Sequence, residues 1–423
     1  MSDSKSILEE AQNLFTQREY QAARDKLLPL VDPNGKGSEQ GPVANLLLSQ
    51  VYEAQGDYQA AHELYRLTVK QYPGEPVTCL RWGRLLTKLH YPQEAARIFQ
   101  LGLSDTRHRL ELTDELAKAK MASGDFKDAN QWALKALELA PGHPVGLFTL
   151  AKVSKCRGLL PRANNLMREC LSKLLESPPK ASQRAAQRNA INIKLAEDLL
   201  WKTLSQLESA GVHAFAHAGT LLGLEREGHL LPYDKDMDIG LPFEEIPAAL
   251  ELLTRNGWME LDASYGLVNP RALFHRETGH YLDLCGFQVE SGNSVTIGGF
   301  WCANIPSKWN RITEFPALQL QRVSKEVGDV WYVAEPAKWL EAMYGDWRTP
   351  DPEFDTVVTA RNLRGFSPLT QYYTLMKIIK YWWDGRINKA LSLCEVFLRH
   401  LPKDELLLQI RGTLRALVRE QQP

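Results

Sequence analysis

Three aspartates spaced two residues apart are the clearest sign of chemistry in this chain of 423 residues. Asp234, Asp236 and Asp238 lie near the end of the stretch HAGTLLGLEREGHLLPYDKDMDIGL, which begins at His217. In a β-strand, side chains at positions i and i+2 point to the same face, so Asp236 and Asp238 would lie together. Like charges so close are costly unless a cation lies between them, and carboxylate oxygens suit Mg2+, with Mn2+ as the alternative. The spacing therefore predicts a divalent metal site that faces substrate phosphates.

The residues before the aspartates favour this interpretation over its alternative, in which paired aspartates are helix caps or solvated turn residues. Gly219 and Thr220 follow a strand-like apolar run, where a turn can lead into a helix whose first amides face a phosphate. Arg226 carries a planar guanidinium that matches two phosphate oxygens. A structural ion pair is the alternative role for this arginine.

The stretch resembles the signature of the LicD/fukutin family of phosphotransferases, which is roughly G-T-L-L-G, an arginine, and then a proline and an aromatic residue before D-x-D-x-D. The matching positions are Gly219, Thr220, Leu221, Leu222, Gly223, Arg226, Pro232, Tyr233, Asp234, Asp236, Asp238 and Ile239. Lys235 departs from the acidic residue that many members carry there, which lowers the negative charge of the site. The resemblance covers roughly residues 195 to 360.

The resemblance implies a nucleotidyltransferase-like domain with a small mixed sheet, in which a third carboxylate lies on a neighbouring strand. Asp283, between apolar residues in HYLDL, matches that later aspartate. It would complete a carboxylate triad of catalytic candidates with Asp236 and Asp238, and Asp234 joins these three as a predicted metal ligand. Asp283 would bind a second ion or accept the proton of the acceptor hydroxyl.

Weaker candidates for substrate contacts are His275, Arg276 and Asp346, the last of which belongs to a segment that resembles the family's closing Y-G-D motif. Three other histidines of this region are interpreted as structural: His217, His229 and His280. Tyr344, the first residue of that motif, and Trp347, directly after it, are interpreted as core aromatics.

The donor class also comes from the resemblance. It implies transfer of a phospho-alcohol (ribitol-phosphate, glycerol-phosphate or phosphocholine) from a CDP-linked donor to a glycan hydroxyl, with release of CMP. A nucleotidyltransferase or a D-x-D glycosyltransferase would use the same carboxylates with a different bond cleaved. A repeat scaffold that carries an inactive inserted domain is the alternative of another class.

The chain before this region repeats with a period of 34 residues, which is typical of tetratricopeptide repeats. Gly56-Asp57, Gly124-Asp125 and Gly158 share one register, and small residues recur at Ala61, Ala95, Ala129 and Ala163. The small positions predict close crossings within helical hairpins. About five helix pairs are expected over residues 4 to 175, and a protein partner could bind their concave face.

The fold class is therefore predicted as α+β, in three domains. A tetratricopeptide domain is expected over residues 1–176. A catalytic domain over 183–365 would begin with one long helix at 183–210 and include a small mixed sheet. A repeat-like helical hairpin is expected over 366–423, with a generic hairpin that packs on the catalytic domain as the alternative.

The composition of the chain bears on nucleic-acid binding, membrane insertion and cysteine chemistry. With 44% hydrophobic residues, 24% charged residues and a formal net charge of -1, the chain shows no sign of general attraction to nucleic acid. The sequence has no apolar run long enough to span a membrane and an acidic rather than apolar N-terminal segment, so a cytoplasmic location, associated with a membrane-bound glycan assembly, is expected. The six cysteines lack C-x-x-C spacing, which indicates neither a zinc site nor a disulfide framework.

Overall fold

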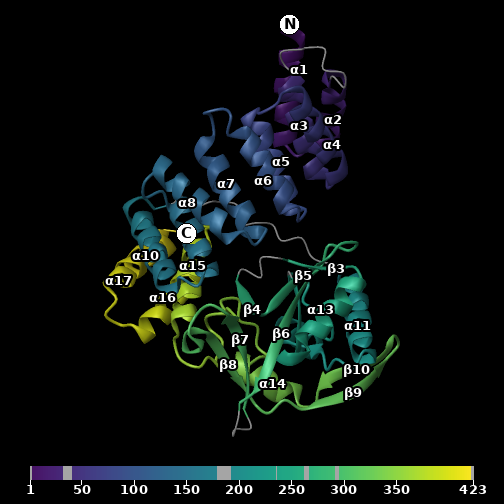
Figure 1. The fold of residues 1–423 in the computed structure, drawn as a ribbon, viewed down its shortest axis with the longest axis vertical. Coiled ribbons are helices and arrows are strands. Elements are labelled where there is room, and N and C mark those ends of the chain that lie inside the picture. Colours follow the sequence, from purple (N-terminus) through teal and green to yellow (C-terminus); the bar gives the residue numbers. More distant parts are fainter. Residues whose placement is uncertain are drawn as a thin grey trace. The chain divides into compact units, whose positions relative to one another are not determined.

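The computed structural model describes residues 2–31, 41–178, 192–234, 236–261, 266–290 and 295–420. The chain forms two compact units, Met1–Pro141 and Gly142–Pro423 (Figure 1). In the described residues the first unit is helical, and the second combines helices with a mixed β-sheet. The predicted α+β class is confirmed. The division after Pro141 falls inside the predicted repeat region, and the domain boundaries at residues 176, 183 and 365 stay predictions.

The described helices of the first unit form four successive hairpins. They are α1 (Ser2–Thr16) with α2 (Tyr20–Leu27), α3 (Gly41–Gln55) with α4 (Tyr58–Gln71), α5 (Pro76–Lys88) with α6 (Pro92–Gly102), and α7 (Arg109–Ala122) with α8 (Phe126–Leu139). A 3-10 turn at Leu28–Leu30 follows α2.

Gly-Asp pairs make the turns of two of these hairpins, α3 with α4 and α7 with α8. Gly56 has a φ of 81°, a left-handed conformation that costs glycine little, and Asp57 then caps α4 by accepting a hydrogen bond from the Ala60 amide. The same arrangement recurs at Gly124 and Asp125. Glycine and aspartate therefore recur in the predicted register because the turn needs a left-handed residue and the next helix needs an N-terminal cap.

Small residues lie where the paired helices cross. Ala61, Ala95 and Ala129 are fully buried. At Gly83, a Cβ atom would lie 2.3 Å from the ring of Phe99, so the helices could not approach as they do with a larger residue. The helices thus confirm the tetratricopeptide pattern predicted from the period.

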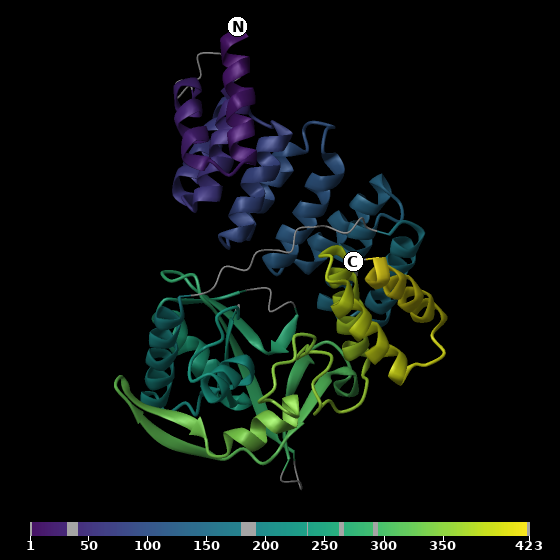
Figure 2. The ribbon, with the colours of Figure 1, turned by 180° about the vertical axis from the view of Figure 1, so that it is seen from behind.

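The fifth predicted pair, α9 (Pro144–Cys156) and α10 (Leu160–Glu176), belongs to the second unit. Helix α10 packs against α15 (Pro368–Trp383), which is followed by α16 (Ile387–His400) and α17 (Glu405–Glu420) (Figure 2). The Arg168 guanidinium of α10 donates two hydrogen bonds of 2.7 and 3.1 Å to the Asp404 carboxylate, which precedes α17. The sheet is therefore inserted in the sequence between two parts of one helical array.

The predicted C-terminal hairpin is present as α15 and α16, but the chain continues into a third helix. Helix α17 buries Leu407, Ile410 and Leu414 at helical spacing and packs on α16. Because the repeat pattern is built of pairs, the prediction of a pair over 366–423 did not include it.

The sheet of the second unit has the order β1-β2-β6-β5-β3, and β7 pairs with β4, β6 and β8. Its strands are β1 (Phe215–Ala216), β2 (Asp236–Pro242), β3 (Trp258–Glu260), β4 (Leu267–Asn269), β5 (Arg271–His275), β6 (Tyr281–Val289), β7 (Thr296–Cys302) and β8 (Arg311–Phe315). Strands β2 and β6 run parallel, and the other described pairs are antiparallel. The predicted mixed sheet is confirmed.

Helices and a separate hairpin surround the sheet. The helices are α11 (Ile193–Ser209), α12 (Ala218–Arg226), α13 (Ile246–Arg255) and α14 (Pro336–Tyr344), with 3-10 turns at Phe243–Glu245 and Ser307–Trp309. The hairpin consists of β9 (Leu320–Lys325) and β10 (Gly328–Val333). Asn192 caps α11, while the start predicted for this helix at residue 183 lies outside the described residues.

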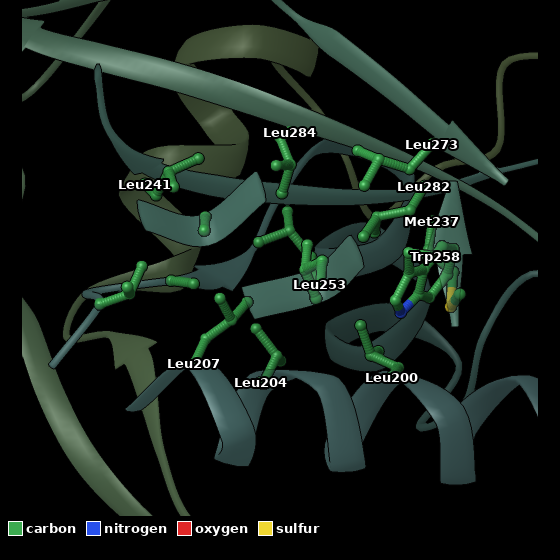
Figure 3. Packing of buried hydrophobic residues seen from close by; sticks show 14 of the residues in the cluster. Leu200, Leu204, Leu207, Met237, Leu241, Leu253, Trp258, Leu273, Leu282 and Leu284 are labelled. Carbon is green, nitrogen blue, oxygen red and sulfur yellow. The ribbon is translucent and has the colours of Figure 1, made fainter. Parts of the chain in front are cut away.

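One face of the sheet carries a leucine-rich core (Figure 3). Leucines of α11 point toward the strands and meet buried residues of β2, β3, β5 and β6, with Leu253 of α13 between them. The residues labelled in that view are Leu200, Leu204, Leu207, Met237, Leu241, Leu253, Trp258, Leu273, Leu282 and Leu284. Since side chains alternate along a strand, the residues between these positions point to the opposite face.

None of the described helices is both long and apolar enough to cross a membrane.

Candidate active site

The carboxylates lie on the face of the sheet opposite the leucine core. Met237, Ile239 and Leu241 of β2 enter that core, so Asp236 and Asp238 point away from it. On β6 the same alternation leaves Asp283 outside the core. The parallel register places Asp238 directly beside Asp283, and Asp236 beside Tyr281. The sheet therefore brings together the aspartates that the sequence placed 45 residues apart.

The start of α12 holds Asp238 in place. The Asp238 amide donates a 2.8 Å hydrogen bond to the Thr220 hydroxyl, and the Gly219 amide donates to the Asp238 carboxylate at 3.3 Å. Ala218, just before, has a φ of 44°, a strained conformation for a residue with a side chain. Gly219 and Thr220 thus form the predicted turn into a helix, and their described contacts are with Asp238.

Close approach of a fourth carboxylate explains the glycine at position 219. A Cβ atom there would lie 2.4 Å from an Asp234 carboxylate oxygen and 3.6 Å from one of Asp238. Any other residue would push Asp234 away from the cluster. Asp234 and Asp238 are half-buried, whereas Asp236 is exposed. Lys235 lies outside the described residues.

Burial and mutual repulsion act on the two carboxyls that face each other. Burial, followed by the charges of Asp236, Asp283 and Asp234, raises the pKa of Asp238 well above its usual range, and the Gly219 amide opposes this rise. Burial and then the charge of Asp236 raise the pKa of Asp283 to about 7. The charges that act most on both carboxyls come from other aspartates. The cluster is thus short of positive charge, as expected of a site for a cation.

These carboxylates fit Mg2+ only together with other ligands. In the described part of the chain, no group of three or more histidine, cysteine, aspartate or glutamate side chains is arranged to hold a metal ion alone. Magnesium commonly binds one or two protein carboxylates and completes its octahedron with water and substrate phosphates. Asp238 with Asp236 or Asp283 meets this requirement in donor type.

Arg226 lies at the end of α12, which packs on α14. Its Nε donates a 2.8 Å hydrogen bond to Glu227, and its Nη1 donates to the Trp347 carbonyl at 3.4 Å. These contacts orient the guanidinium and account for the structural role considered for it. They leave its remaining N–H groups for another anion.

The Tyr344 ring packs in the hydrophobic cluster of α12 and α14, as predicted, and its hydroxyl lies close enough to the carboxylates to respond to their charge. Its hydroxyl is buried and has no hydrogen-bond partner in the described residues. Burial, followed by the charges of Asp238 and Asp234, raises the pKa of this phenol, and Arg226 opposes the rise. The hydroxyl therefore lies within electrostatic reach of the arginine and both aspartates. Buried polar groups are nearly always satisfied, so an unpaired one beside a charged cluster calls for a partner.

Three weaker candidates lie elsewhere among the described residues. The buried ring of His275 contacts Thr278 through Nδ1 at 3.0 Å and packs on Trp258. The guanidinium of Arg276 contacts the sulfur of Met259, and exposed Asp346 accepts a hydrogen bond from Thr349. The contacts just described do not involve the aspartates, so the substrate roles of these three residues stay predictions.

The other aromatic and histidine residues follow the interpretation from sequence. His217 is buried and its Nδ1 accepts a hydrogen bond from the Trp339 indole at 3.2 Å, while burial lowers its pKa to about 3. Trp347 is buried in the cluster formed by α12 and α14. His280 and Tyr281 line a small hollow of about 20 Å3 beside Asp236, enough for a single water. Tyr281 precedes Asp283 by two residues, and that spacing could have indicated its position.

The region that carries the carboxylate pair, the glycine turn and the helix start also matches a known domain. Residues 211–325 match the family model of the LicD/FKTN/FKRP nucleotidyltransferase domain. The resemblance predicted from the motif is confirmed. This LicD-like domain contains Asp234, Asp236, Asp238 and Asp283, whereas Tyr344 lies beyond the matched residues.

Curated relatives of the LicD-like domain carry a more specific name. The chain is 23% identical over 192 residues to proteins named "Ribitol-5-phosphate transferase FKTN" from Macaca fascicularis and Homo sapiens, and the aligned region is 44% of this chain. A mouse protein of the same name is 24% identical over 190 residues. The chain spans 40% of the length of each relative.

Solved structures similar to this chain carry tetratricopeptide-like repeats or align with the helical part. A MamA RS-1 ArsTM double mutant is 14% identical and covers 43% of this chain and 99% of its own, with a TM-score of 0.37. A putative kinesin light chain from Podosopora anserina with nearly identical TPR-like repeats is 19% identical and covers 42% of this chain and 98% of its own, also at 0.37. We therefore assign the tetratricopeptide-like architecture from the helical hairpins of this chain and not from these similarities.

Proposed function

We propose that the LicD-like domain is a metal-dependent phosphotransferase. It transfers a phospho-alcohol from a CDP-linked donor to a hydroxyl of a glycan acceptor and releases CMP. The observation that carries this proposal is the half-buried pair Asp238 and Asp283 on adjacent parallel strands, short of positive charge and next to the start of a helix. The match of residues 211–325 to a nucleotidyltransferase domain supports the same chemistry.

Each carboxylate would have a role that depends on its position in the site. Asp236 and Asp238 would hold Mg2+, or Mn2+, against the donor diphosphate, with Asp234 beside them. When bound, the ion would neutralise charge on the bridging oxygens and help CMP to leave. Asp283 would either hold a second ion or accept the proton of the acceptor hydroxyl, for which a pKa of about 7 is suitable.

Two residues would bind the phosphates without a metal. Arg226 lies beside Tyr344, and its guanidinium would bind donor phosphate oxygens as charge develops on them. The unpaired Tyr344 hydroxyl would donate a hydrogen bond to a phosphate oxygen of the bound donor, which would satisfy it. Thr220 and Gly219 would act on the reaction by fixing Asp238.

Ribitol-phosphate is the first alcohol to test, because the curated relatives are named ribitol-5-phosphate transferases. Glycerol-phosphate and phosphocholine are the other members of the donor class. The acceptor would be a glycan of a cytoplasmic, membrane-associated assembly, and the repeats would offer a concave face to a protein partner.

The test separates the functions that share these carboxylates. The full chain is incubated with Mg2+ and CDP-ribitol, CDP-glycerol or CDP-choline, and CMP is measured; parallel reactions contain nucleoside triphosphates or sugar nucleotides. Metal-dependent CMP release supports the proposal, pyrophosphate indicates a nucleotidyltransferase, and consumption of a sugar nucleotide indicates a glycosyltransferase. If calorimetry with Mg2+ shows no binding of any of these CDP-linked donors, nucleoside triphosphates or sugar nucleotides, the domain is an inactive insert and the proposal is wrong.

A further inference from the structure

A second hollow lies beside the carboxylate site, between α11, the end of α12 and the β9–β10 hairpin. We call it the hairpin hollow. It has a volume of about 550 Å3, within the range of small-molecule sites. The polar and aromatic residues of its lining are Glu197, Trp201, Glu225, Gln321, Lys325 and Tyr332. None of these residues has a role in the site described above.

The hairpin hollow adjoins the carboxylate site through α11 and the segment after α12. Ala196 lines the small hollow that contains Asp234 and Asp236, and the next residue, Glu197, lines the hairpin hollow. A Glu197 carboxylate oxygen also accepts a 2.9 Å hydrogen bond from the amide of Leu230, which lines the small hollow. The two hollows are therefore neighbours along α11.

The charges of the hairpin hollow disfavour a phosphate. Two carboxylates, Glu197 and Glu225, face one ammonium group, that of Lys325, and the aspartate cluster adds negative charge nearby. The Lys325 ammonium lies 4.3 Å from the centre of the Trp201 ring. An anionic ligand would meet a net negative lining, so the charges leave a neutral or a cationic ligand, and the hydrogen-bonding groups described next decide between them.

The polar groups suit a ligand rich in hydroxyls. The Tyr332 hydroxyl donates a 2.6 Å hydrogen bond to one oxygen of Glu225, which orients this carboxylate. Carboxylate and amide oxygens of Glu197, Glu225 and Gln321 can accept hydrogen bonds from sugar hydroxyls. Trp201 adds apolar surface to the lining, and the Lys325 ammonium, which lies over its ring, can donate hydrogen bonds to sugar hydroxyls.

We propose that the hairpin hollow binds a neutral saccharide. Its use as the subsite for the glycan acceptor rests on the proposed phosphotransferase function, whereas saccharide binding itself does not. Glu197, Trp201 and Tyr332 lie outside residues 211–325, so this subsite would be a feature of this chain rather than of the matched domain.

The test measures binding without metal or donor. The full chain in EDTA is examined by saturation-transfer NMR with N-acetylglucosamine, glucose and glucose 6-phosphate as probes. Wild-type protein should saturate the ring protons of at least one neutral sugar, and glucose 6-phosphate should bind more weakly than glucose. Trp201→Leu should weaken binding about fivefold or more.

Trp331→Leu is the matched control, because Trp331 lies on the same hairpin but packs on His213 and Arg322. It should bind sugar like the wild type. Glu225→Gln, which keeps the shape of the side chain, should also weaken binding. The proposal is overturned if wild-type protein binds neither neutral sugar, if glucose 6-phosphate binds more tightly than glucose, or if Trp201→Leu and Trp331→Leu behave alike.

The sugar-binding test and the test of the proposed phosphotransferase function can fail independently of each other. Sugar binding without CMP release from any CDP-linked donor would leave the hairpin hollow as a saccharide site and reject the phosphotransferase. CMP release without sugar binding would reject only the hollow.

Discussion

Asp238 of β2 lies directly beside Asp283 of β6, on parallel strands whose leucines point to the other face of the sheet. Burial and neighbouring carboxylates raise the pKa of both groups. The pair is therefore electrostatically unfavourable in the protein alone. Such an arrangement favours a bound cation and lowers the stability of the metal-free protein. The site can therefore be tested through stability measurements without any substrate.

Replacing either member of the pair should abolish turnover. Asp238→Asn and Asp283→Asn keep the shape of the side chain but remove a charge, and each should lower the rate of CMP formation by about 100-fold or more. Asp25→Asn, at an exposed aspartate of α2 that accepts a hydrogen bond from Gln21, serves as the control and should stay active. Activity of Asp283→Asn equal to that of the wild type would place the third carboxylate elsewhere.

Asp283→Asn should stabilise the metal-free protein at alkaline pH. The folded pKa of Asp283 is raised from 3.8 to about 7, so the folded protein resists ionisation of this carboxyl more than the unfolded chain does. Stability from this group is present below the unfolded pKa and is lost as pH rises toward 7. In EDTA at about pH 8, Asp283→Asn should raise the unfolding free energy by about 1–3 kcal/mol, discounted for the partial exposure of the carboxyl.

Near pH 4 the difference between Asp283→Asn and wild type should shrink, since the wild-type carboxyl is then largely protonated. Denaturant unfolding at both pH values gives the comparison. A variant less stable than wild type at about pH 8 would show that Asp283 stabilises the fold, against the account of a strained pair.

Tyr344→Phe should separate activity from stability. Because the Tyr344 hydroxyl is buried without a partner, its removal should leave the melting temperature unchanged or higher. Loss of its hydrogen bond to the bound donor should lower kcat/KM by about 10-fold or more. Tyr65→Phe is the control for a satisfied hydroxyl, since Tyr65 bonds to Glu53 at 2.6 Å, and it should lower stability without affecting activity. Full activity of Tyr344→Phe would return this residue to the core.

Gly219→Ala should disable the site through contact rather than charge. The new Cβ would lie 2.4 Å from an Asp234 oxygen and must displace that carboxylate, so Mg2+-dependent activity should fall strongly. Gly412→Ala provides the comparison, because no atom lies within 4 Å of its Cβ position, and alanine in helix α17 should be neutral or stabilising by up to about 1 kcal/mol. Equal activity of both variants would contradict the packing described for Asp234.

Arg226→Lys should weaken donor binding. Lysine keeps the charge but loses the planar fork, and the loss of charge-assisted contacts of about 1.5–3 kcal/mol should raise the apparent KM for the CDP-linked donor by about 10- to 100-fold. Steady-state kinetics with a fixed Mg2+ concentration measures this. If only thermal stability falls, the contacts of Arg226 with Trp347 and Glu227 are its whole role.

The sequence predicted the elements that carry strong local patterns. The 34-residue period placed the hairpins because Ala61, Ala95 and Ala129 must be small wherever helices cross. The spacing of Asp236 and Asp238 predicted a shared face, since strand alternation is local. Asp283 required the family motif, because only the pairing of β6 with β2 brings it to that face.

Tertiary contacts decided what the sequence could not. Tyr344 was predicted as a core aromatic and its ring does pack in the core, but nothing local shows that its hydroxyl lies unpaired within reach of the charge of Asp238. The hairpin hollow joins Trp201 to Tyr332 across 131 residues of sequence, and no period or motif links them. His275 and Arg276 were proposed from residue type, while the contacts of their side chains depend on the neighbouring strand β3.

The most direct test of the central claim is CMP release from CDP-ribitol by the full chain, measured with Mg2+ and with EDTA, for wild-type protein and for Asp238→Asn. The account predicts that CMP appears only with wild-type protein and Mg2+. CMP release that persists in EDTA or in Asp238→Asn would contradict a metal-dependent reaction at the Asp238 and Asp283 pair.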